Sequence, residues 1–296
     1  MTLPTISVIT PSYNQAEFLE ETILSVLGQR YPALQYIIID GGSADNSLEI
    51  IKKYEKELYY WESTKDKGQS HAINKGFKHS TGDILMWLNS DDMLMPNALY
   101  YIADLVLENK EDFYFGNCIR YNENSIGMES FKSDVLTASH SFLLEQSDYI
   151  IQSSSFWKRK VWEEVGELNE NLHYGLDWEW FLRVKMKGIS MRPFNKCISL
   201  YRVHDRHKTG NGGRARQEEL LSIYNIYNPN GARIYQHLME QDKDWSIKDI
   251  YKTIVLKKYY YFRKKPLSEA RILQLIKPKK YGEFTEVEIG SFQRML

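Results

Sequence analysis

The apolar positions in the N-terminal third of the chain form short runs that alternate with stretches of helical spacing. Such runs are typical of buried strands. They cover residues 6–10, 36–39, 59–61 and 84–88. Helical spacing recurs between and after them, over residues 19–27, 48–58, 70–78 and 96–107. This alternation predicts an α/β domain with a mostly parallel central sheet, helices on both faces and right-handed crossovers.

Polar loops follow the predicted strands or precede the predicted helices. They comprise residues 11–14 (Pro-Ser-Tyr-Asn), 40–43 (Asp-Gly-Gly-Ser), 66–69 (Asp-Lys-Gly-Gln) and 89–92 (Asn-Ser-Asp-Asp). Because ligands of open α/β sheets bind at the carboxyl ends of the strands, we expect these loops to converge on one site. Asn14 and Glu17 have the spacing of a capping box for the first helix. Neither a G-x-G-x-x-G fingerprint nor a P-loop follows the first strand.

The strand predicted over 84–88 leads into two adjacent carboxylates, Asp91 and Asp92. Carboxylate oxygens suit a hard divalent cation such as Mg²⁺ or Mn²⁺, which usually keeps several waters and is completed by substrate phosphates. The alternative is an acidic helix start, since Pro96 opens a predicted helix just beyond. The residues alone leave both interpretations open.

Composition and charge exclude several classes of protein. The chain has 296 residues, 43% of them hydrophobic and 26% charged, enough for one large domain or a domain with an appendage. Its net charge of -1 argues against nucleic-acid binding. No apolar run approaches the roughly 20 residues that span a bilayer, and the N-terminus does not resemble a signal peptide, so we expect a soluble or peripheral cytoplasmic protein. Cys118 and Cys197 lack metal or disulfide spacing and are expected to be buried thiols.

The ordered set of motifs resembles family 2 glycosyltransferases of the GT-A fold, in particular the branch that builds bacterial O-antigen and exopolysaccharide repeat units. The motifs lie at residues 7–14, 40–45, 66–69, 87–92, 152–157, 175–179 and 201–204. The resemblance implies a GT-A, Rossmann-like sheet and a hexosyltransferase-type enzyme. The enzyme would transfer one sugar, with inversion, from a nucleotide diphosphate sugar to a hydroxyl of a glycan or lipid-linked saccharide acceptor.

The resemblance also assigns roles to individual residues. It implies a Mn²⁺ or Mg²⁺ cofactor held by Asp92, with Asp91 contacting the ribose or the metal and His204 supporting the metal or the diphosphate. A solvated histidine in a basic loop is the alternative for His204, and turn or cap chemistry is the alternative for the donor residues between 66 and 74. The donor is expected to contact Pro11, Tyr13, Asn14, Asp40, Asp66, Gly68, Asn74, Ser90 and Asp91.

The base that deprotonates the acceptor hydroxyl should be a carboxylate on the acceptor side. The resemblance assigns this catalytic role to Asp177, at the start of an amphipathic helix, with Glu179 as the second candidate. Relatives often have Glu-Asp where this chain has Leu176-Asp177, which leaves Asp177 as the better candidate. The alternative is that Asp177 only caps the helix.

The chain departs from many relatives at Gly41. Those relatives have a second acid at this position, which commonly reads the nucleobase. Because Gly41 has no side chain, either Asp40 or a backbone group would take over. A UDP-sugar is the default donor, and guanine and thymine stay open as bases.

Residues 1–209 are predicted to form the GT-A catalytic domain, and residues 210–296 a helical C-terminal region. A glycine-rich break over 210–213 separates them, and helical spacing follows over 214–227. The basic, aromatic stretch 254–265 has two interpretations. It either contacts the inner face of the cell membrane, which suits a lipid-linked acceptor, or packs on the catalytic domain or on a second copy in a homo-oligomer.

Two other functions fit parts of the pattern. A sugar-1-phosphate nucleotidyltransferase shares the sheet and the metal chemistry, but it should have a glycine-rich N-terminal loop with a basic pair, where this chain has Pro-Ser-Tyr-Asn. A protein that binds nucleotide sugars or glycans without catalysis does not need Asp92, Asp177 and His204 together. We therefore predict an inverting, metal-dependent glycosyltransferase in surface polysaccharide assembly.

Overall fold

The computed structural model describes residues 2–122, 131–205, 208, 212–240, 252, 256, 268–277 and 295. Its contacts divide the chain into two compact units. The first comprises Met1–His140 and Tyr149–Asn211, and the second comprises Ser141–Asp148 and Gly212–Leu296. All of the motifs therefore lie in the first unit.

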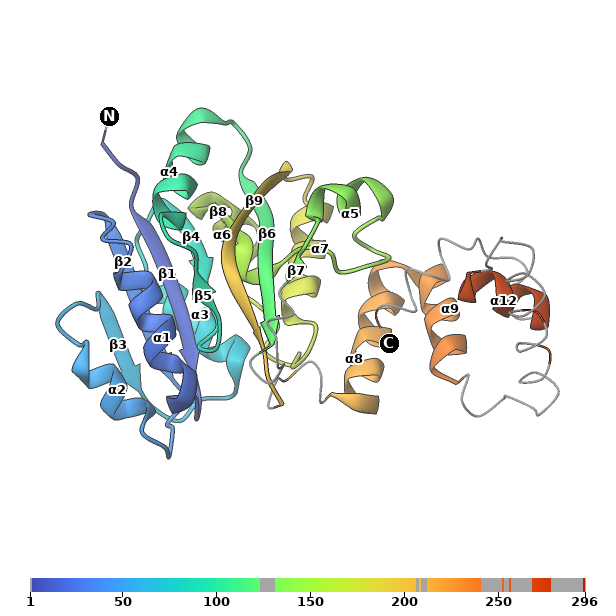
Figure 1. Ribbon diagram of the computed structural model, residues 1–296, viewed down its shortest axis with the longest axis horizontal. Coiled ribbons are helices and arrows are strands. Elements are labelled where there is room, and N and C mark those ends of the chain that lie inside the picture. The colour runs from blue at the N-terminus through green and yellow to red at the C-terminus, as the bar shows by residue number, and fades with distance from the viewer. Residues whose placement is uncertain are drawn as a thin grey trace. The chain divides into compact units, whose positions relative to one another are not determined.

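Within the described residues, parallel strands form one half of the sheet, in the order β3-β2-β1-β4. Their bounds are β1 Ile6–Ser12, β2 Leu34–Asp40, β3 Tyr60–Ser63 and β4 Ile84–Trp87. The connecting helices are α1 Ala16–Leu27, α2 Ser47–Lys53 and α3 Gln69–His79. Figure 1 shows α1 running along the strands. The predicted α/β sheet flanked by helices is confirmed.

Alternate residues of these strands are buried against different helices. Ile6 and Val8 of β1 share a hydrophobic cluster with Leu19 of α1. The next residue, Ile9, faces α3, where Gly76 lets the helix approach so closely that an added Cβ would lie 2.4 Å from the Ile9 side chain. Because both faces are covered, the strands can be continuously apolar, which is the pattern that predicted them.

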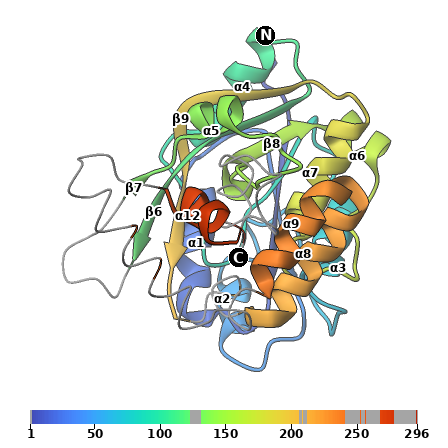
Figure 2. The same cartoon turned by 90° about the vertical axis from the view of Figure 1, so that its right-hand side faces the viewer.

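Beyond β4 the sheet continues with strands that the sequence did not predict. β8 Ser155–Lys158 pairs antiparallel with both β4 and β6, whereas β6 Phe113–Asn122 and β9 Met191–Val203 are parallel. Figures 1 and 2 both show β9 alongside β6. Short strands β5 Met93–Leu94 and β7 Phe131–Lys132 pair with β9 and β6. The remaining elements of this unit are α4 Ala98–Glu108, α5 Val135–Ser141, η1 Gln152–Ser154, α6 Arg159–Val165 and α7 Leu176–Met186.

An aromatic layer fixes α7 against the sheet. Trp180 of α7 lies 4.6 Å from Trp157 of β8 and 6.3 Å from Trp87 of β4, measured between ring centroids. Phe113 of β6 stacks on Trp157 at 5.7 Å and meets Phe181 of α7 edge-on at 5.5 Å. Large aromatic side chains bury much apolar area each, so this layer holds α7 against the sheet.

The capping box predicted for α1 is wrong. Asn14 has a φ of 52°, and its side-chain Oδ1 accepts a hydrogen bond from the Ala44 backbone N–H at 2.8 Å. The start of α1 is capped from the next loop instead, where Asp45 Oδ2 accepts from the Ala16 N–H at 3.0 Å. A partner distant in sequence has therefore replaced the local one.

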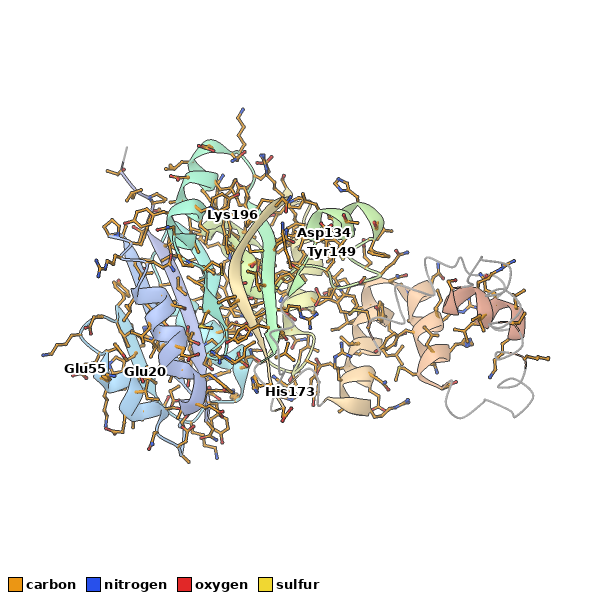
Figure 3. All side chains as sticks on the ribbon, viewed as in Figure 1. Glu20, Glu55, Asp134, Tyr149, His173 and Lys196 are labelled. Carbon is orange, nitrogen blue, oxygen red and sulfur yellow. The ribbon has the colours of Figure 1, made fainter. Side chains whose placement is uncertain are left out.

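Helix α2 is shorter than its sequence pattern predicts. Helical spacing continues to residue 58, whereas α2 ends at Lys53. Tyr54 instead donates its hydroxyl at 2.7 Å to Glu20 of α1, whose side chain is labelled in Figure 3. Tyr54 and Leu58 still pack against the core cluster, so the spacing indicated burial rather than helix.

The second unit contains α8 Gly213–Tyr227, α9 Pro229–Met239 and α12 Glu269–Ile276. Tyr224 of α8 and Tyr235 of α9 pack with ring centroids 4.9 Å apart, and the Tyr224 hydroxyl donates to the Gln146 carbonyl at 3.0 Å. The predicted helix over 214–227 is observed as α8. The stretch 254–265 lies, apart from position 256, outside the described residues. Among the helices that the structure describes, none is both long and apolar enough to cross a membrane.

Candidate active site

Residues 89–92, which connect β4 to β5, form an acidic turn that is held by α1. Thr22 of α1 is fully buried, and its hydroxyl lies 2.9 Å from the Ser90 carbonyl oxygen and 2.7 Å from that of Asp92. The Asp92 backbone N–H donates to the Asn89 carbonyl at 3.1 Å. Ser90, a predicted donor contact, is only 5% exposed. Contacts within the protein therefore fix the backbone of this turn.

The end of β9 brings His204 to the acidic turn. His204 Nε2 lies 3.3 Å from Asp91 Oδ2. The imidazole packs against the Phe18 ring with centroids 4.4 Å apart, which fixes its orientation. The His204 side chain is 6% exposed and that of Asp91 is 21% exposed. The structure thus brings two of the predicted metal ligands together while Asp91 stays accessible.

Arg202, two residues before His204, braces the same turn. Its backbone N–H donates to Asp92 Oδ1 at 3.2 Å and its Nε donates to the Asp91 carbonyl at 3.0 Å. Its guanidinium lies over the Phe18 ring and pairs through Nη2 with Glu21 of α1. Arg202 is 2% exposed, so its charge acts at close range on the acidic pair.

Asp92 is in an unfavourable environment for an ionised carboxylate. Burial raises the pKa of the Asp92 carboxyl well above its usual range, and the neighbouring charge of Asp91 raises it further, whereas Arg202 opposes the shift. The side chain faces inward, and the residue is 2% exposed. Additional positive charge at this turn would favour the ionised form.

The donor set fits an open site for a divalent cation. Within the described residues, no three or more His, Cys, Asp or Glu side chains form a preformed metal cluster. Mg²⁺ and Mn²⁺ sites of phosphate enzymes typically use one or two carboxylates and complete their shell with waters and substrate phosphates. The Asp91 carboxylate with the His204 imidazole, and Asp92 adjacent, supply oxygen and nitrogen donors of that kind.

Asp40 shapes the loop at the end of β2. It is fully buried; Oδ2 accepts from the Ser63 hydroxyl at 2.7 Å and from the N–H groups of Gly42 and Ser43 at 3.1 and 2.9 Å. Oδ1 accepts from the Ser43 hydroxyl at 2.5 Å. A carboxylate has about four acceptor positions, and groups of this loop and Ser63 make four hydrogen bonds to it, so Asp40 holds its loop in shape. Its contact with the donor stays a prediction.

The loop after β1 is tied to the loop after β2. The Asn14 backbone N–H donates to the Ser43 hydroxyl at 2.8 Å, and the Asn14 side chain is bonded to Ala44. Pro11 is buried within β1, whereas Tyr13 is 61% exposed. Of these predicted donor contacts, Tyr13 therefore presents the exposed side chain, and Asn14 positions the loop.

The loop before α3 is shaped by Asp66 and Gly68. Asp66 Oδ1 accepts from the Gly68 N–H at 2.8 Å. Gly68 has a φ of 116°, a conformation that L side chains rarely adopt. The following residue, Gln69, donates through Nε2 to Asn89 Oδ1 at 2.9 Å. This bond joins the loop to the acidic turn.

The structure gives Asn74 a structural role, and its contact with the donor stays a prediction. Asn74 is 1% exposed. Its Nδ2 donates to the Leu168 carbonyl at 3.0 Å and to Glu170 Oε1 at 3.2 Å, and its Oδ1 accepts from the Leu168 N–H at 2.9 Å. Both the nitrogen and the oxygen of this amide are hydrogen-bonded, and these bonds join α3 to the segment that leads into α7.

Asp177 lies in the first turn of α7 and is half-buried. Its Oδ1 accepts from the Trp178 N–H at 2.9 Å. Burial raises the pKa of the Tyr201 phenol, and the charges of Asp92, Asp91 and Asp177 each raise it further. Asp177 and the acidic turn thus act electrostatically on the same phenol.

Glu179, the second candidate for the catalytic base, is bonded to Arg183, so Asp177 stays the better candidate of the two. Both of its carboxylate oxygens accept from Arg183 Nε, at 3.0 and 3.1 Å. Arg183 also donates to the carbonyls of Val165 and Glu167. Glu179 therefore helps to hold the end of α6 against α7.

Sequence reasoning missed the residues that support the site. Arg202 stands inside the recognised Tyr-Arg-x-His motif, which was the available signal. Thr22 gave a weaker signal, a single hydroxyl on the buried face of a helix next to Ile23. Gln152 Nε2 donates to the Trp87 carbonyl at 2.7 Å, a contact between distant segments that no local pattern indicates.

Comparison with known sequences agrees with this geometry. The profile of "Glycosyl transferase family 2" matches residues 7–165. An uncharacterised glycosyltransferase of Mycobacterium tuberculosis is 29% identical over 188 residues, covering 62% of this chain and 70% of that protein. The putative teichuronic acid biosynthesis glycosyltransferase TuaG of Bacillus subtilis is 26% identical over 221 residues, covering 73% and 85%.

Solved structures show the same fold. TarS of S. aureus, in complex with UDP-GlcNAc, superposes with a TM-score of 0.62 at 15% identity, covering 98% of this chain and 90% of that one. The mannosyltransferase PcManGT of Pyrobaculum calidifontis, in complex with GDP-Man and Mn²⁺, gives 0.61 at 15% identity, covering 99% and 87%. With the family profile matching more than half of its length, the chain belongs to glycosyl transferase family 2 and has the GT-A fold.

Proposed function

We propose that this protein is an inverting, metal-dependent glycosyltransferase that moves one sugar from a nucleotide diphosphate sugar, by default a UDP-sugar, to an acceptor hydroxyl. The observation that carries the proposal is that the charges of Asp91, Asp92 and Asp177 all act on the Tyr201 phenol, with His204 Nε2 3.3 Å from Asp91 Oδ2. The acidic turn suits a leaving diphosphate, and the Asp177 carboxylate suits an attacking hydroxyl. Family membership supplies the reaction class.

Metal dependence is supported by the residues at the acidic turn. Asp91 and His204, with Asp92 adjacent, would hold Mn²⁺ or Mg²⁺. When bound, the cation supplies positive charge that stabilises the departing diphosphate. The Mn²⁺ and GDP-Man complex of PcManGT supports the proposal for a protein of the same fold. Arg202 holds Asp91 and Asp92 in place through their main-chain and side-chain oxygens.

Asp177 is proposed as the general base. It accepts the proton of the acceptor hydroxyl while that oxygen bonds to the anomeric carbon. The bond from the anomeric carbon to the diphosphate oxygen breaks on the opposite face, and its electron pair leaves with the nucleoside diphosphate. Attack opposite to the leaving group inverts the anomeric configuration.

Surface polysaccharide assembly is the proposed setting, with a glycan or lipid-linked saccharide as acceptor. The name of TuaG, which refers to teichuronic acid biosynthesis, supports this setting. Residues 210–296 are proposed to contact the acceptor, a membrane surface or a second copy of the chain. We place the enzyme in the cytoplasm, with O-antigen-type repeat units as one acceptor class.

Paired substitutions in α7 test the proposal. We expect Asp177→Asn to lower kcat by about 100-fold or more while donor affinity is retained, because a general base contributes about that much. Glu179→Gln is the matched control, a carboxylate-to-amide change on the same helix that should lower stability through Arg183 and leave kcat within a few-fold. Turnover and donor binding by calorimetry provide the readouts. Full turnover by Asp177→Asn would contradict the assigned base.

A further inference from the structure

The side chain of Gln152 lies at the end of β4, where that strand leads into the acidic turn. β8 pairs antiparallel with β4 at Ile84 and Leu85. Further along β4, the chain that precedes β8 forms η1 instead of strand, and Gln152 Nε2 donates to the Trp87 carbonyl at 2.7 Å. A side-chain amide thus takes the place of a main-chain partner at the carboxyl end of β4.

The bond to Trp87 determines which way the Gln152 amide faces. A carbonyl oxygen can only accept, so the amide nitrogen faces the Trp87 carbonyl and the amide oxygen is left for another partner. Gln152 is 9% exposed, and within the residues that the structure describes its Oε1 has no hydrogen-bond partner. Buried acceptors in native proteins are mostly paired, because an unpaired one costs free energy. This oxygen therefore suits a hydrogen-bond donor on a bound molecule.

The rest of η1 is held against the face of β9 that carries Tyr201. The Ser199 Oγ lies 3.0 Å from Ser153 Oγ and 2.6 Å from Ser154 Oγ. From Ser199 to Tyr201 the pairing of β9 with β6 is regular. Because side chains alternate between the faces of a strand, Tyr201 lies on the same face as Ser199. On this phenol the charges of Asp177 and the acidic turn act together.

The proposed function decides which bound group can reach the Gln152 amide, and the inference rests on it. The diphosphate would lie at the acidic turn and the acceptor hydroxyl at Asp177, so the transferred sugar lies between them. Gln152 adjoins both regions, through the end of β4 and through the face of β9 that carries Tyr201. An ionised diphosphate offers only acceptor oxygens, whereas a sugar offers hydroxyl donors.

We propose that Gln152 Oε1 accepts a hydrogen bond from one hydroxyl of the transferred sugar, and that it selects donors with this hydroxyl over the corresponding deoxy sugars. The amide nitrogen is already bonded to the Trp87 carbonyl, so the donor of the new bond comes from the sugar. A site built to bind a hydroxyl rejects an analogue without it strongly, because its buried acceptor is then left unpaired.

Gln29 has a similar amide in another part of the fold and provides a matched control. It is 7% exposed, its Nε2 donates to the Ser25 and Met95 carbonyls, and its Oε1 also has no hydrogen-bond partner among the described residues. Gln29 lies beyond the C-terminal end of α1, whereas the loops of the site meet the start of this helix. Position, and not an unpaired oxygen alone, therefore distinguishes Gln152.

Calorimetric titration of the full chain in Mn²⁺, with a nucleotide sugar that wild type turns over and with its nucleoside diphosphate, tests the inference. Gln152→Met keeps the length of the side chain and removes both polar atoms. It should weaken the nucleotide sugar by about 5- to 100-fold and leave the nucleoside diphosphate within about twofold, because the lost bond is to the sugar. Gln29→Met should leave both affinities unchanged, and thermal unfolding checks that each variant is folded.

Donor analogues that each lack one sugar hydroxyl identify the contact. For wild type, one of them should lower kcat/KM by about 100-fold or more. For Gln152→Met the same analogue should cause little further loss, because the two changes remove the same hydrogen bond. Losses that add for every analogue would overturn the inference.

The outcomes separate this inference from the proposed function. If Gln152→Met weakens the nucleoside diphosphate and the nucleotide sugar alike, Gln152 only supports the end of β4, and the proposed function stands. A loss confined to the KM of the acceptor would assign the oxygen to the acceptor and also overturn the inference. If folded wild type releases no nucleoside diphosphate from any donor, the proposed function fails and the inference fails with it.

Discussion

Arg202 places a positive charge beside the carboxylates of the acidic turn. Its contacts with Asp91, Asp92 and Glu21 join β9, the acidic turn and α1. The sequence predicted Asp91, Asp92 and His204 because the order of motifs identifies them. It could not predict the partners of Arg202, because Arg202 and Asp92 are 110 positions apart and only the folded sheet brings them together.

Arg202→Met tests this bracing role. We expect the free energy of unfolding to fall by about 3 kcal/mol, because the change breaks a buried charge network. It leaves the Asp91 carbonyl oxygen without its Nε donor and removes the positive charge that opposes the raised pKa of Asp92. Glu21→Gln should cost less than about 1 kcal/mol, since the Glu21 side chain is 58% exposed and returns to solvent. Urea unfolding of both variants measures the difference. Equal losses would show that the ion pair, and not the contact with the acidic turn, carries the stability.

Asp40 and Asp66 illustrate what residue patterns leave open on the donor side. Both follow predicted strands, and the sequence favours each of them equally as a contact to a ligand. Their hydrogen bonds within the described residues differ: Asp40 is surrounded by donors of its own loop, whereas Asp66 keeps one oxygen available. Such a distinction depends on loop geometry, which spacing along the chain does not determine.

At the scale of elements, the parallel half of the sheet was predictable and the mixed half was not. β1 and β2 are buried on both faces, so each is a continuous apolar run bounded by turns. β6 includes Gly116, Asn117 and Arg120, and β9 alternates irregularly between buried and exposed residues. Register shifts around Asn117 show that β6 and β9 pair irregularly. The pairing of β6 with β9 joins segments that are distant in sequence, and the local pattern of apolar residues does not indicate such a pairing.

The link between α3 and the segment before α7 makes an element-scale prediction. Asn74→Ala should lower the free energy of unfolding by about 2–3 kcal/mol, because it leaves the buried N–H and carbonyl of Leu168 unpaired. It should also lower kcat while donor affinity is kept, since this segment leads to Asp177. Denaturant unfolding and steady-state kinetics measure the two effects.

Lys78→Ala is the control for Asn74→Ala. Lys78 also joins α3 to this segment, through Glu167, but both side chains are largely exposed, at 61% and 46%. Exposed pairs of this kind contribute about 0–1 kcal/mol. If the two variants unfold alike, the Asn74 link does not stabilise the segment.

At the scale of the whole molecule, the contacts assign Ser141–Asp148 to the same unit as the C-terminal helices. Asn228 Nδ2 donates to the Glu145 carbonyl at 3.1 Å, and Tyr224 donates to Gln146. A single boundary at residue 209, as the sequence predicts, does not describe this division. The short internal segment Ser141–Asp148 belongs to the same unit as residues far along the chain. The division into a catalytic domain and a helical region stays a prediction. The residues proposed for the chemistry all lie in the first unit.

Release of nucleoside diphosphate from a panel of UDP-, GDP- and dTDP-sugars, with Mn²⁺, with Mg²⁺ and with EDTA, tests the central claim most directly. The account predicts that one class of donor is turned over, that EDTA abolishes turnover, and that added Mn²⁺ or Mg²⁺ restores it. The proposed ligands Asp91 and His204 would fill only part of the shell of the cation. Turnover that is equally fast in EDTA would contradict the proposed metal site. Failure to bind any donor would contradict the proposed function.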